Sequence, residues 1–265
     1  AYIFAAAIGI SLGLIGAGGS ILTVPVLVYL AHVEPVLATA YSLFVVGSTA
    51  LVGGIQNAFK KLVDFKTAII FGVPSILAVY ITRAFIMPWI PNEFHILDSL
   101  EVSKGLFLLL LFAVLMVATS ISMIRGNGKK KEIEKFENNA KPHNYGLVFL
   151  EGIGVGTLTG LVGAGGGFLI IPALVLLAGL EMKLAVGTSL FIIALKSLIG
   201  FTGDIQTGAP IDWSFLLLFT AFSVSGIFIG SWLHQFVDGH RLRKGFGWFV
   251  LIMGFYMIFK ETIFK

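Results

Sequence analysis

The sequence predicts an all-α integral membrane protein built from two inverted repeats, each a broken re-entrant helical hairpin followed by three transmembrane helices. Three observations predict it. Of the 265 residues, 57% are hydrophobic and only 12% are charged, whereas soluble domains carry about 25% charged residues. The apolar residues form runs long enough to cross a bilayer as helices. A glycine-rich motif also occurs twice, 147 positions apart.

The repeated motif divides the chain into two similar halves. Its copies are Gly13-Leu14-Ile15-Gly16-Ala17-Gly18-Gly19-Ser20, followed by Pro25, and Gly160-Leu161-Val162-Gly163-Ala164-Gly165-Gly166-Gly167, followed by Pro172. The same offset aligns residues 38–44 with 185–191. Duplicated halves are common in secondary transporters. We therefore expect a first membrane repeat at 1–125, a polar cytoplasmic linker at 126–143 and a second membrane repeat at 144–265.

Each glycine cluster interrupts an apolar run, at 2–31 in the first half and at 145–179 in the second. In the first run the pieces on either side reach only roughly 21 and 16 Å as helices, short of the hydrocarbon core of about 30 Å. We therefore expect a broken span or a re-entrant hairpin there. Full spans are expected at 35–59, 65–90, 103–124, 184–203, 213–237 and 245–264.

The placement of basic residues favours the hairpin. If both broken segments fold back, 13 of the 18 lysines and arginines fall on one side of the membrane and four on the other, whereas spanning segments would place 11 on one side and six on the other. Cytoplasmic loops carry the excess of basic residues. The sequence therefore predicts hairpins that enter from opposite faces of the cell inner (cytoplasmic) membrane in a multi-pass protein. Both termini would then lie outside the cytoplasm.

The two glycine breaks are the first candidate site. The first amides of a helix carry about half a positive charge, and two such ends that converge would bind an anion. The alternative is that glycines only allow close helix packing, which we prefer for Gly9, Gly13, Gly152, Gly156 and Gly160. The expected substrate-binding residues of the breaks are Gly16, Ala17, Gly18, Gly19, Ser20, Gly163, Ala164, Gly165, Gly166 and Gly167.

Lys196 is the second candidate, because it lies in the middle of an apolar run. A lysine at that depth costs roughly 2.5–3.5 kcal/mol on insertion scales, so it normally faces a cavity or a partner. It is expected to bind the anion, and the alternative is a buried ion pair with Glu151. Thr49 occupies the equivalent position of the first half, so the site would be asymmetric.

Polar side chains near the breaks complete the expected set. Ser42 and Ser189 lie at matching positions of the two halves, with Thr188 beside Ser189, and the three would donate hydroxyl groups to the substrate, or else form hydrogen bonds between helices. Asp204 is expected to cap the end of its helix, with gating of entry to the site as the alternative. Arg83, near the end of its span, is expected to snorkel to the interface, with a role in an anion-attracting vestibule as the alternative.

Other classes of protein find little support. The absence of cysteine excludes disulfides and thiolate chemistry, and the five histidines lack metal-ligand spacing. No Ser-His-Asp or paired-carboxylate constellation is present. We expect no enzymatic activity, no catalytic residue, no metal and no cofactor. The expected partners are a small anionic substrate and the lipid bilayer, with a possible homodimer and no nucleic acid.

The paired motifs with Pro25 and Pro172, together with Ala-Val-Gly-Thr-Ser-Leu at 185–190, resemble the TauE/SafE family of sulfite and organosulfonate exporter-like membrane proteins. The resemblance covers nearly the whole chain. It implies a carrier for a small sulfur-containing or organic anion such as sulfite, a sulfonate or sulfoacetate, coupled to protons or the membrane potential. A secondary transporter with alternating access is the expected function. An anion channel and a membrane scaffold or assembly factor are the alternatives.

Overall fold

The computed structural model describes residues 2–97, 100–125, 145–233 and 239–263, and the linker expected at 126–143 falls outside them. The described chain is helical apart from one small hairpin of two strands. Six of its helices are long and apolar enough to cross a membrane. The expectation of an all-helical membrane protein is therefore confirmed.

The first half begins with the broken segment and continues with long helices. In order, its elements are α1 (Tyr2–Ile15), the 3-10 helix η1 (Gly16–Leu22), α2 (Thr23–Pro25), the π-helix η2 (Val26–Leu30), α3 (Pro35–Phe59), α4 (Phe65–Ile81), the π-helix η3 (Thr82–Ile86), α5 (Met87–Trp89), β1 (Glu93–Leu97), β2 (Leu100–Ser103) and α6 (Lys104–Arg125). Strands β1 and β2 pair antiparallel. The sequence analysis did not predict this hairpin.

The second half repeats the plan without strands in its described residues. Its elements are α8 (Tyr145–Val162), α9 (Gly167–Leu176), α10 (Met182–Gln206), α11 (Trp213–Leu233) and α12 (Gly239–Ile263). Both apolar runs break at the glycine clusters, as predicted. None of the helical pieces beside the breaks is among the six that are long enough to cross a membrane.

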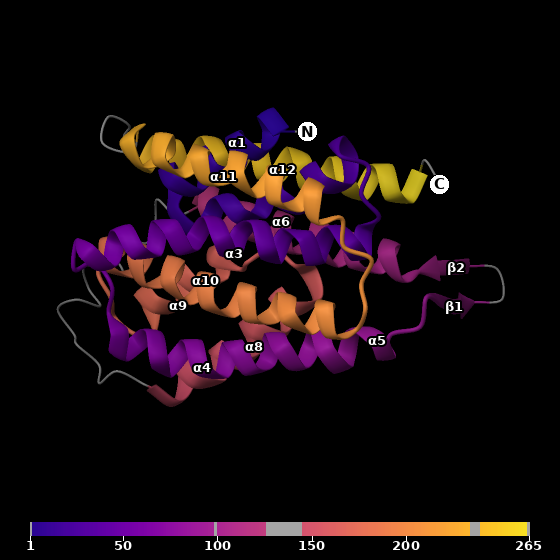
Figure 1. Ribbon diagram of the computed structural model, residues 1–265, viewed down its shortest axis with the longest axis horizontal. Helices are drawn as coiled ribbons and strands as arrows, with labels where there is room; N and C mark the ends of the chain where they lie inside the picture. The colour runs from indigo at the N-terminus through magenta and orange to yellow at the C-terminus, as the bar shows by residue number, and fades with distance from the viewer. Residues whose placement is uncertain (1, 98–99, 126–144, 234–238, 264–265) are drawn as a thin grey trace.

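The two halves interlock through their equivalent helices. In the middle of the molecule α3 packs against α10 (Figure 1), and these are the most buried of the six long helices. On one side α11 packs on α3 and is covered by α1, and on the other α4 packs on α10 and is covered by α8. Helix α6 packs against α12. The contacts of α11 with α3 and α1 thus recur as those of α4 with α10 and α8.

Glycines explain how α1 and α8 approach their partners so closely. A Cβ atom added to Gly9 would lie 1.8 Å from the carbonyl oxygen of Ser223 in α11. At the equivalent position, a Cβ on Gly156 would lie 2.5 Å from the carbonyl oxygen of Ser75 in α4. The packing role preferred for the glycines of α1 and α8 is therefore confirmed at both helices.

Matching aspartates begin α4 and α11. The Asp64 carboxylate accepts a hydrogen bond from the Thr67 N–H at 2.9 Å, and the Asp212 carboxylate accepts one from the Phe215 N–H at 3.0 Å. A side chain that binds a free N–H of the first turn stabilises a helix start. The internal repeat therefore extends to the N-terminal caps of α4 and α11.

Candidate functional site

The first break lies against the central helix of the opposite half. Gly16 has φ +72°, the left-handed region that favours glycine, and this ends α1. A Cβ at Gly16 would lie 2.7 Å from Val186 Cγ1 in α10, and one at Gly19 would lie 2.5 Å from the backbone nitrogen of Leu12. The chain therefore turns back along α1 while it touches α10. Ser20, at the end of this turn, is completely buried.

The second break makes the equivalent contact with the first half. Gly163, Gly165 and Gly166 all have positive φ, between +64° and +75°. A Cβ at Gly163 would lie 2.6 Å from the Thr39 Cα in α3, and one at Gly165 would lie 2.6 Å from Val46 Cγ1 of the same helix. Each break therefore packs on the central helix of the other half.

The two breaks also meet each other, as expected. A Cβ at Gly165 would lie 3.4 Å from the Ser20 Cβ and 3.4 Å from Ile193 Cγ2 in α10. Ala164 is fully buried beside them. For Ala17 and Gly18 the structure describes only the backbone of η1. The glycine clusters of the two halves thus form one continuous region between α3 and α10.

Lys196 reaches the start of α9 from α10. Its side chain is fully buried, and its Nζ donates a hydrogen bond to Thr159 Oγ1 at 2.9 Å. The same Nζ lies 2.9 Å from the place where a Cβ on Gly166 would be. Gly166 is the N-cap residue of α9, and the first N–H groups of a helix lack acceptors within it. The buried ammonium of Lys196 therefore lies beside the free backbone amides at the start of α9.

Lys196 forms no ion pair with any described residue, so the hypothesis of a pair with Glu151 is wrong. Glu151 keeps a buried carboxylate oxygen, Oε2, without a hydrogen-bond partner. At the equivalent position of the first half, Thr49 donates to the carbonyl of Val45, and its Oγ1 lies 3.0 Å from Ser223 Oγ. The charge is thus present in one half only.

Two of the three candidate hydroxyl residues lie on the helix faces that carry the breaks. Ser42 lies between Thr39 and Val46 on one face of α3. Its Oγ is buried and has no hydrogen-bond partner. Ser189 lies on the face of α10 that also carries Val186, and it donates to the Val186 carbonyl at 2.8 Å. Of the three candidate hydroxyls, that of Ser42 has no partner within the described residues and is available to a ligand.

Thr188 does not join this group. Its Oγ1 accepts a hydrogen bond from the Asp64 N–H at 2.9 Å, and the neighbouring Gly187 approaches the carbonyl oxygen of Leu62. Thr188 therefore faces the turn between α3 and α4, because on a helix its direction differs by about 200° from that of Val186. The sequence placed Thr188 close to the breaks along the chain but could not give its direction.

Two expectations about charged residues are wrong. Arg83 does not snorkel: it is fully buried in the protein, where its Nη1 lies 3.2 Å from Asp204 Oδ1 and donates to Thr39 Oγ1 at 3.0 Å. Asp204 therefore pairs with Arg83 and does not cap α10. The sequence analysis also missed Thr159 as a partner of Lys196. The one sign of it in the sequence is that a threonine stands where the first half has Leu12.

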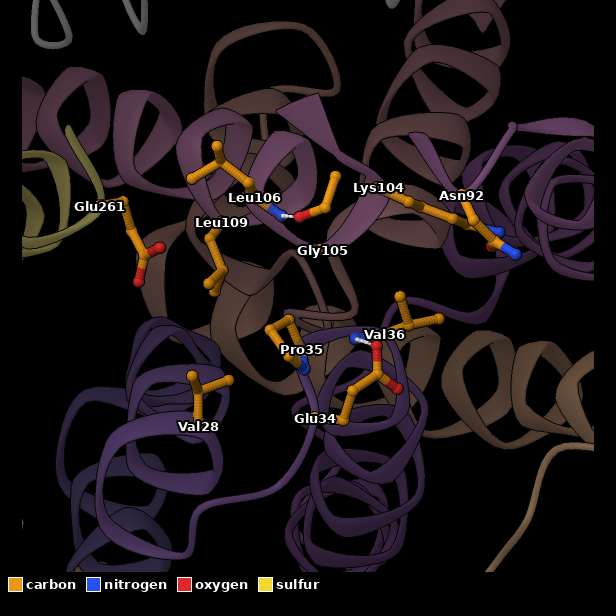
Figure 2. Close-up of a pocket in the computed structure, with 11 residues that line it drawn as sticks. Val28, Glu34, Pro35, Val36, Asn92, Lys104, Gly105, Leu106, Leu109 and Glu261 are labelled. Carbon is orange, nitrogen blue, oxygen red and sulfur yellow. Dashed lines mark hydrogen bonds between the residues drawn. The ribbon is translucent and has the colours of Figure 1, made fainter. Parts of the chain in front are cut away.

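A pocket of about 410 Å³ opens at the end of the molecule that carries the β1–β2 hairpin. Figure 2 shows Lys104 and Asn92 on one side of it and Glu261 on the other, with Glu34 and Val36 at the start of α3. None of the residues expected to bind the substrate lines this pocket. Among the described residues no three metal-ligating side chains cluster.

Taken together, six membrane-length helices around two touching helix breaks and a buried lysine define a multi-pass membrane protein with a polar centre. The family description "Sulfite exporter TauE/SafE" matches residues 1–257. The chain belongs to this family of membrane transporters.

Relatives of similar length support the assignment. A probable membrane transporter protein of Xylella fastidiosa (strain 9a5c) is 29% identical over 259 residues, which cover 96% of this chain and 92% of the relative. The probable membrane transporter protein YunE of Bacillus subtilis (strain 168) is 33% identical over 220 residues, which cover 77% of this chain and 76% of YunE. No solved structure matches the chain.

Proposed function

We propose that this transporter moves a small sulfur-containing or organic anion of the sulfite, sulfonate or sulfoacetate class across the cytoplasmic membrane by alternating access. The observation that carries the proposal is the buried Lys196, which no carboxylate neutralises among the described residues. An unpaired charge inside a protein is costly. An anion bound at its ammonium would remove that cost.

The surroundings of Lys196 suit an oxyanion. The ammonium has three N–H donors, and one of them is used by Thr159. The first amides of α9 lie beside it and favour negative charge. Ser42 Oγ is a further buried donor without a partner. The ammonium and the amides would thus surround the oxygens of one sulfite or sulfonate group, and the proposal adds the Ser42 hydroxyl as a third donor.

The proposed architecture has each broken segment as a re-entrant hairpin and the halves inverted in the membrane. The six long helices then supply three spans to each half, with both termini outside the cytoplasm. The turn between α3 and α4, which carries Lys60 and Lys61, lies at the opposite end from the β1–β2 hairpin (Figure 1). This arrangement agrees with the excess of basic residues on the cytoplasmic side.

The way the halves interlock supports the proposal of alternating access. Ser42, Ser189 and Lys196 are all fully buried, so the site is closed to both sides in this conformation. Each break rests on the central helix of the other half. A tilt of one half against the other would separate a break from its central helix on one side of the membrane at a time. Transport would be coupled to protons or to the membrane potential.

The test begins with sulfite, methanesulfonate and sulfoacetate, each added to detergent-solubilised protein, since a ligand that binds the folded state raises its thermal stability. An anion that stabilises the protein is then followed in reconstituted vesicles. Saturable flux of that anion would support the proposal. Currents far above carrier turnover would indicate a channel, and neither stabilisation nor flux would favour a scaffold role.

A further inference from the structure

The ion pair of Arg83 and Asp204 is a second charged centre, distinct from Lys196. It joins the two halves, because Arg83 lies in η3 of the first half and Asp204 in α10 of the second. The repeat aligns Arg83 of the first half with Ser231 of the second, and Asp204 of the second half with Asn57 of the first. Asn57 donates to the Gly53 carbonyl of its own helix. The fold therefore does without such a pair at the equivalent place, which suggests a role beyond stability.

Only one of the three guanidinium nitrogens of Arg83 forms hydrogen bonds with the described residues. Nη1 serves both Asp204 and Thr39, whereas the buried Nε and Nη2 have no hydrogen-bond partner. These two nitrogens form one edge of the planar group and donate two parallel hydrogen bonds, the geometry that binds carboxylates and other oxyanions bidentately. Asp204 Oδ2 is likewise buried and without a partner.

Charge balance links an anion at this edge to a proton. The charged groups around the pair are Lys104 at the start of α6, whose Nζ donates to the Met87 carbonyl, and Glu34 before α3. Lys104 and the exposed Glu34 both line the pocket and carry opposite charges, and the buried pair of Arg83 and Asp204 is neutral by itself. A bound monoanion would leave an excess negative charge in a buried place, which is costly. A proton on Oδ2 of Asp204 would restore neutrality while Oδ1 stays with Arg83.

The pair lies between the open pocket and the breaks. Thr39 Oγ1 accepts from Arg83 and donates to the carbonyl of Val36 at 2.7 Å, and Val36 lines the pocket. On its other side Thr39 touches Gly163 of the second break. An anion that enters through the pocket would thus meet Arg83 before it reaches Lys196.

We propose that the free Nε–Nη2 edge of Arg83 is a second anion subsite, at which a monovalent sulfite or sulfonate anion binds together with a proton taken up by Asp204. The inference rests on the proposed function, since it assumes that the transported solute is an anion. The inference identifies the coupled ion as a proton and the Asp204 carboxyl group as its carrier.

The experiment measures anion binding and proton uptake together. Purified protein in weakly buffered detergent solution is titrated with methanesulfonate, which stays ionised, and a pH-indicator dye counts the protons. A Lys196→Met variant isolates the subsite because it removes the other cation. We expect this variant to bind the anion with uptake of about one proton per anion. Anion binding by the wild type but not by Lys196→Met would overturn the subsite and leave the proposed function standing.

Two further substitutions in the Lys196→Met background separate the subsite from a merely structural ion pair. Arg83→Lys keeps the pair with Asp204 but lacks the second edge, so anion binding should weaken at least ~10-fold. Asp204→Asn should bind the anion without proton uptake. Unchanged binding in the first, or unchanged proton uptake in the second, would overturn the proposal. If Arg83→Lys fails to fold, the Asp204→Asn result decides. Methanesulfonate that does not bind the wild type either counts against the subsite and the proposed function together.

Discussion

Tyr41 and Thr188, at equivalent positions of α3 and α10, each bind the backbone N–H of an aspartate in the opposite half. The Tyr41 hydroxyl accepts from the Asp212 N–H at 2.6 Å, and Thr188 Oγ1 accepts from the Asp64 N–H at 2.9 Å. Each aspartate in turn caps the helix that follows it. Helix α3 therefore fixes the start of α11, and helix α10 fixes the start of α4.

Replacing either acceptor should cost stability and leave anion affinity unchanged. Thr188→Val and Tyr41→Phe each leave a backbone N–H without its acceptor, a loss of about 1–3 kcal/mol. Thermal unfolding in detergent measures the first effect, and anion-induced stabilisation measures the second. An affinity loss for Thr188→Val with full stability would return Thr188 to the binding site, where the sequence analysis had put it.

Removal of the buried charge should separate binding from folding. We expect Lys196→Met to fold with equal or higher thermal stability, because an apolar side chain replaces an ammonium without a counter-charge. The apparent affinity for sulfite or sulfonate, read from anion-induced stabilisation, should fall at least ~10-fold, which corresponds to about 1.4 kcal/mol. Lys183→Met is the matched control, since Lys183 lies in the same helix but is exposed. Equal losses in both variants would contradict a site at Lys196.

The Gly166 position should tolerate no side chain. Its φ of +71° is strained for alanine, and a Cβ there would lie 2.1 Å from Thr159 Cγ2. We expect Gly166→Ala to lose about 1–2 kcal/mol from the left-handed backbone alone, and more from the clash. Gly154→Ala should be neutral or stabilising, because nothing lies within 4 Å of its added Cβ and alanine favours a helix.

A double variant tests whether the clash with Thr159 causes the loss of stability in Gly166→Ala. Thr159→Ser removes the Cγ2 atom that would collide with the new Cβ, and keeps the hydroxyl that binds Lys196. Gly166→Ala combined with Thr159→Ser should therefore recover part of the stability lost by Gly166→Ala, as read from thermal unfolding. The absence of any recovery would show that the backbone conformation, and not the clash, dominates.

The sequence predicted the long helices well because their signal is local. Apolar runs bounded by polar residues gave the spans to within a few residues, and glycine clusters gave both breaks, since few other residues adopt their positive φ. The internal repeat also predicted that the breaks of the two halves belong together. These features depend on composition and spacing along the chain.

What the sequence could not give are directions and distant pairs. Thr188 points to the α3–α4 turn because of the rotation of α10, which packing sets. The pair of Arg83 and Asp204 joins residues 121 positions apart, and no local pattern distinguishes a buried arginine near a helix end from a snorkelling one. The β1–β2 hairpin lies in a short connection without strong alternation.

The membrane orientation is open to a direct test, because the chain contains no cysteine and any introduced thiol is therefore the only one. Lys60→Cys and Glu93→Cys place exposed thiols at the α3–α4 turn and in the β1–β2 hairpin. The proposed topology predicts that a membrane-impermeant maleimide added to intact cells labels Glu93→Cys, and labels Lys60→Cys only after the membrane is opened. Permeabilised cells give the control for reactivity. The opposite pattern would invert the topology, and labelling of both thiols from outside would rule out the assignment of the basic α3–α4 turn to the cytoplasm.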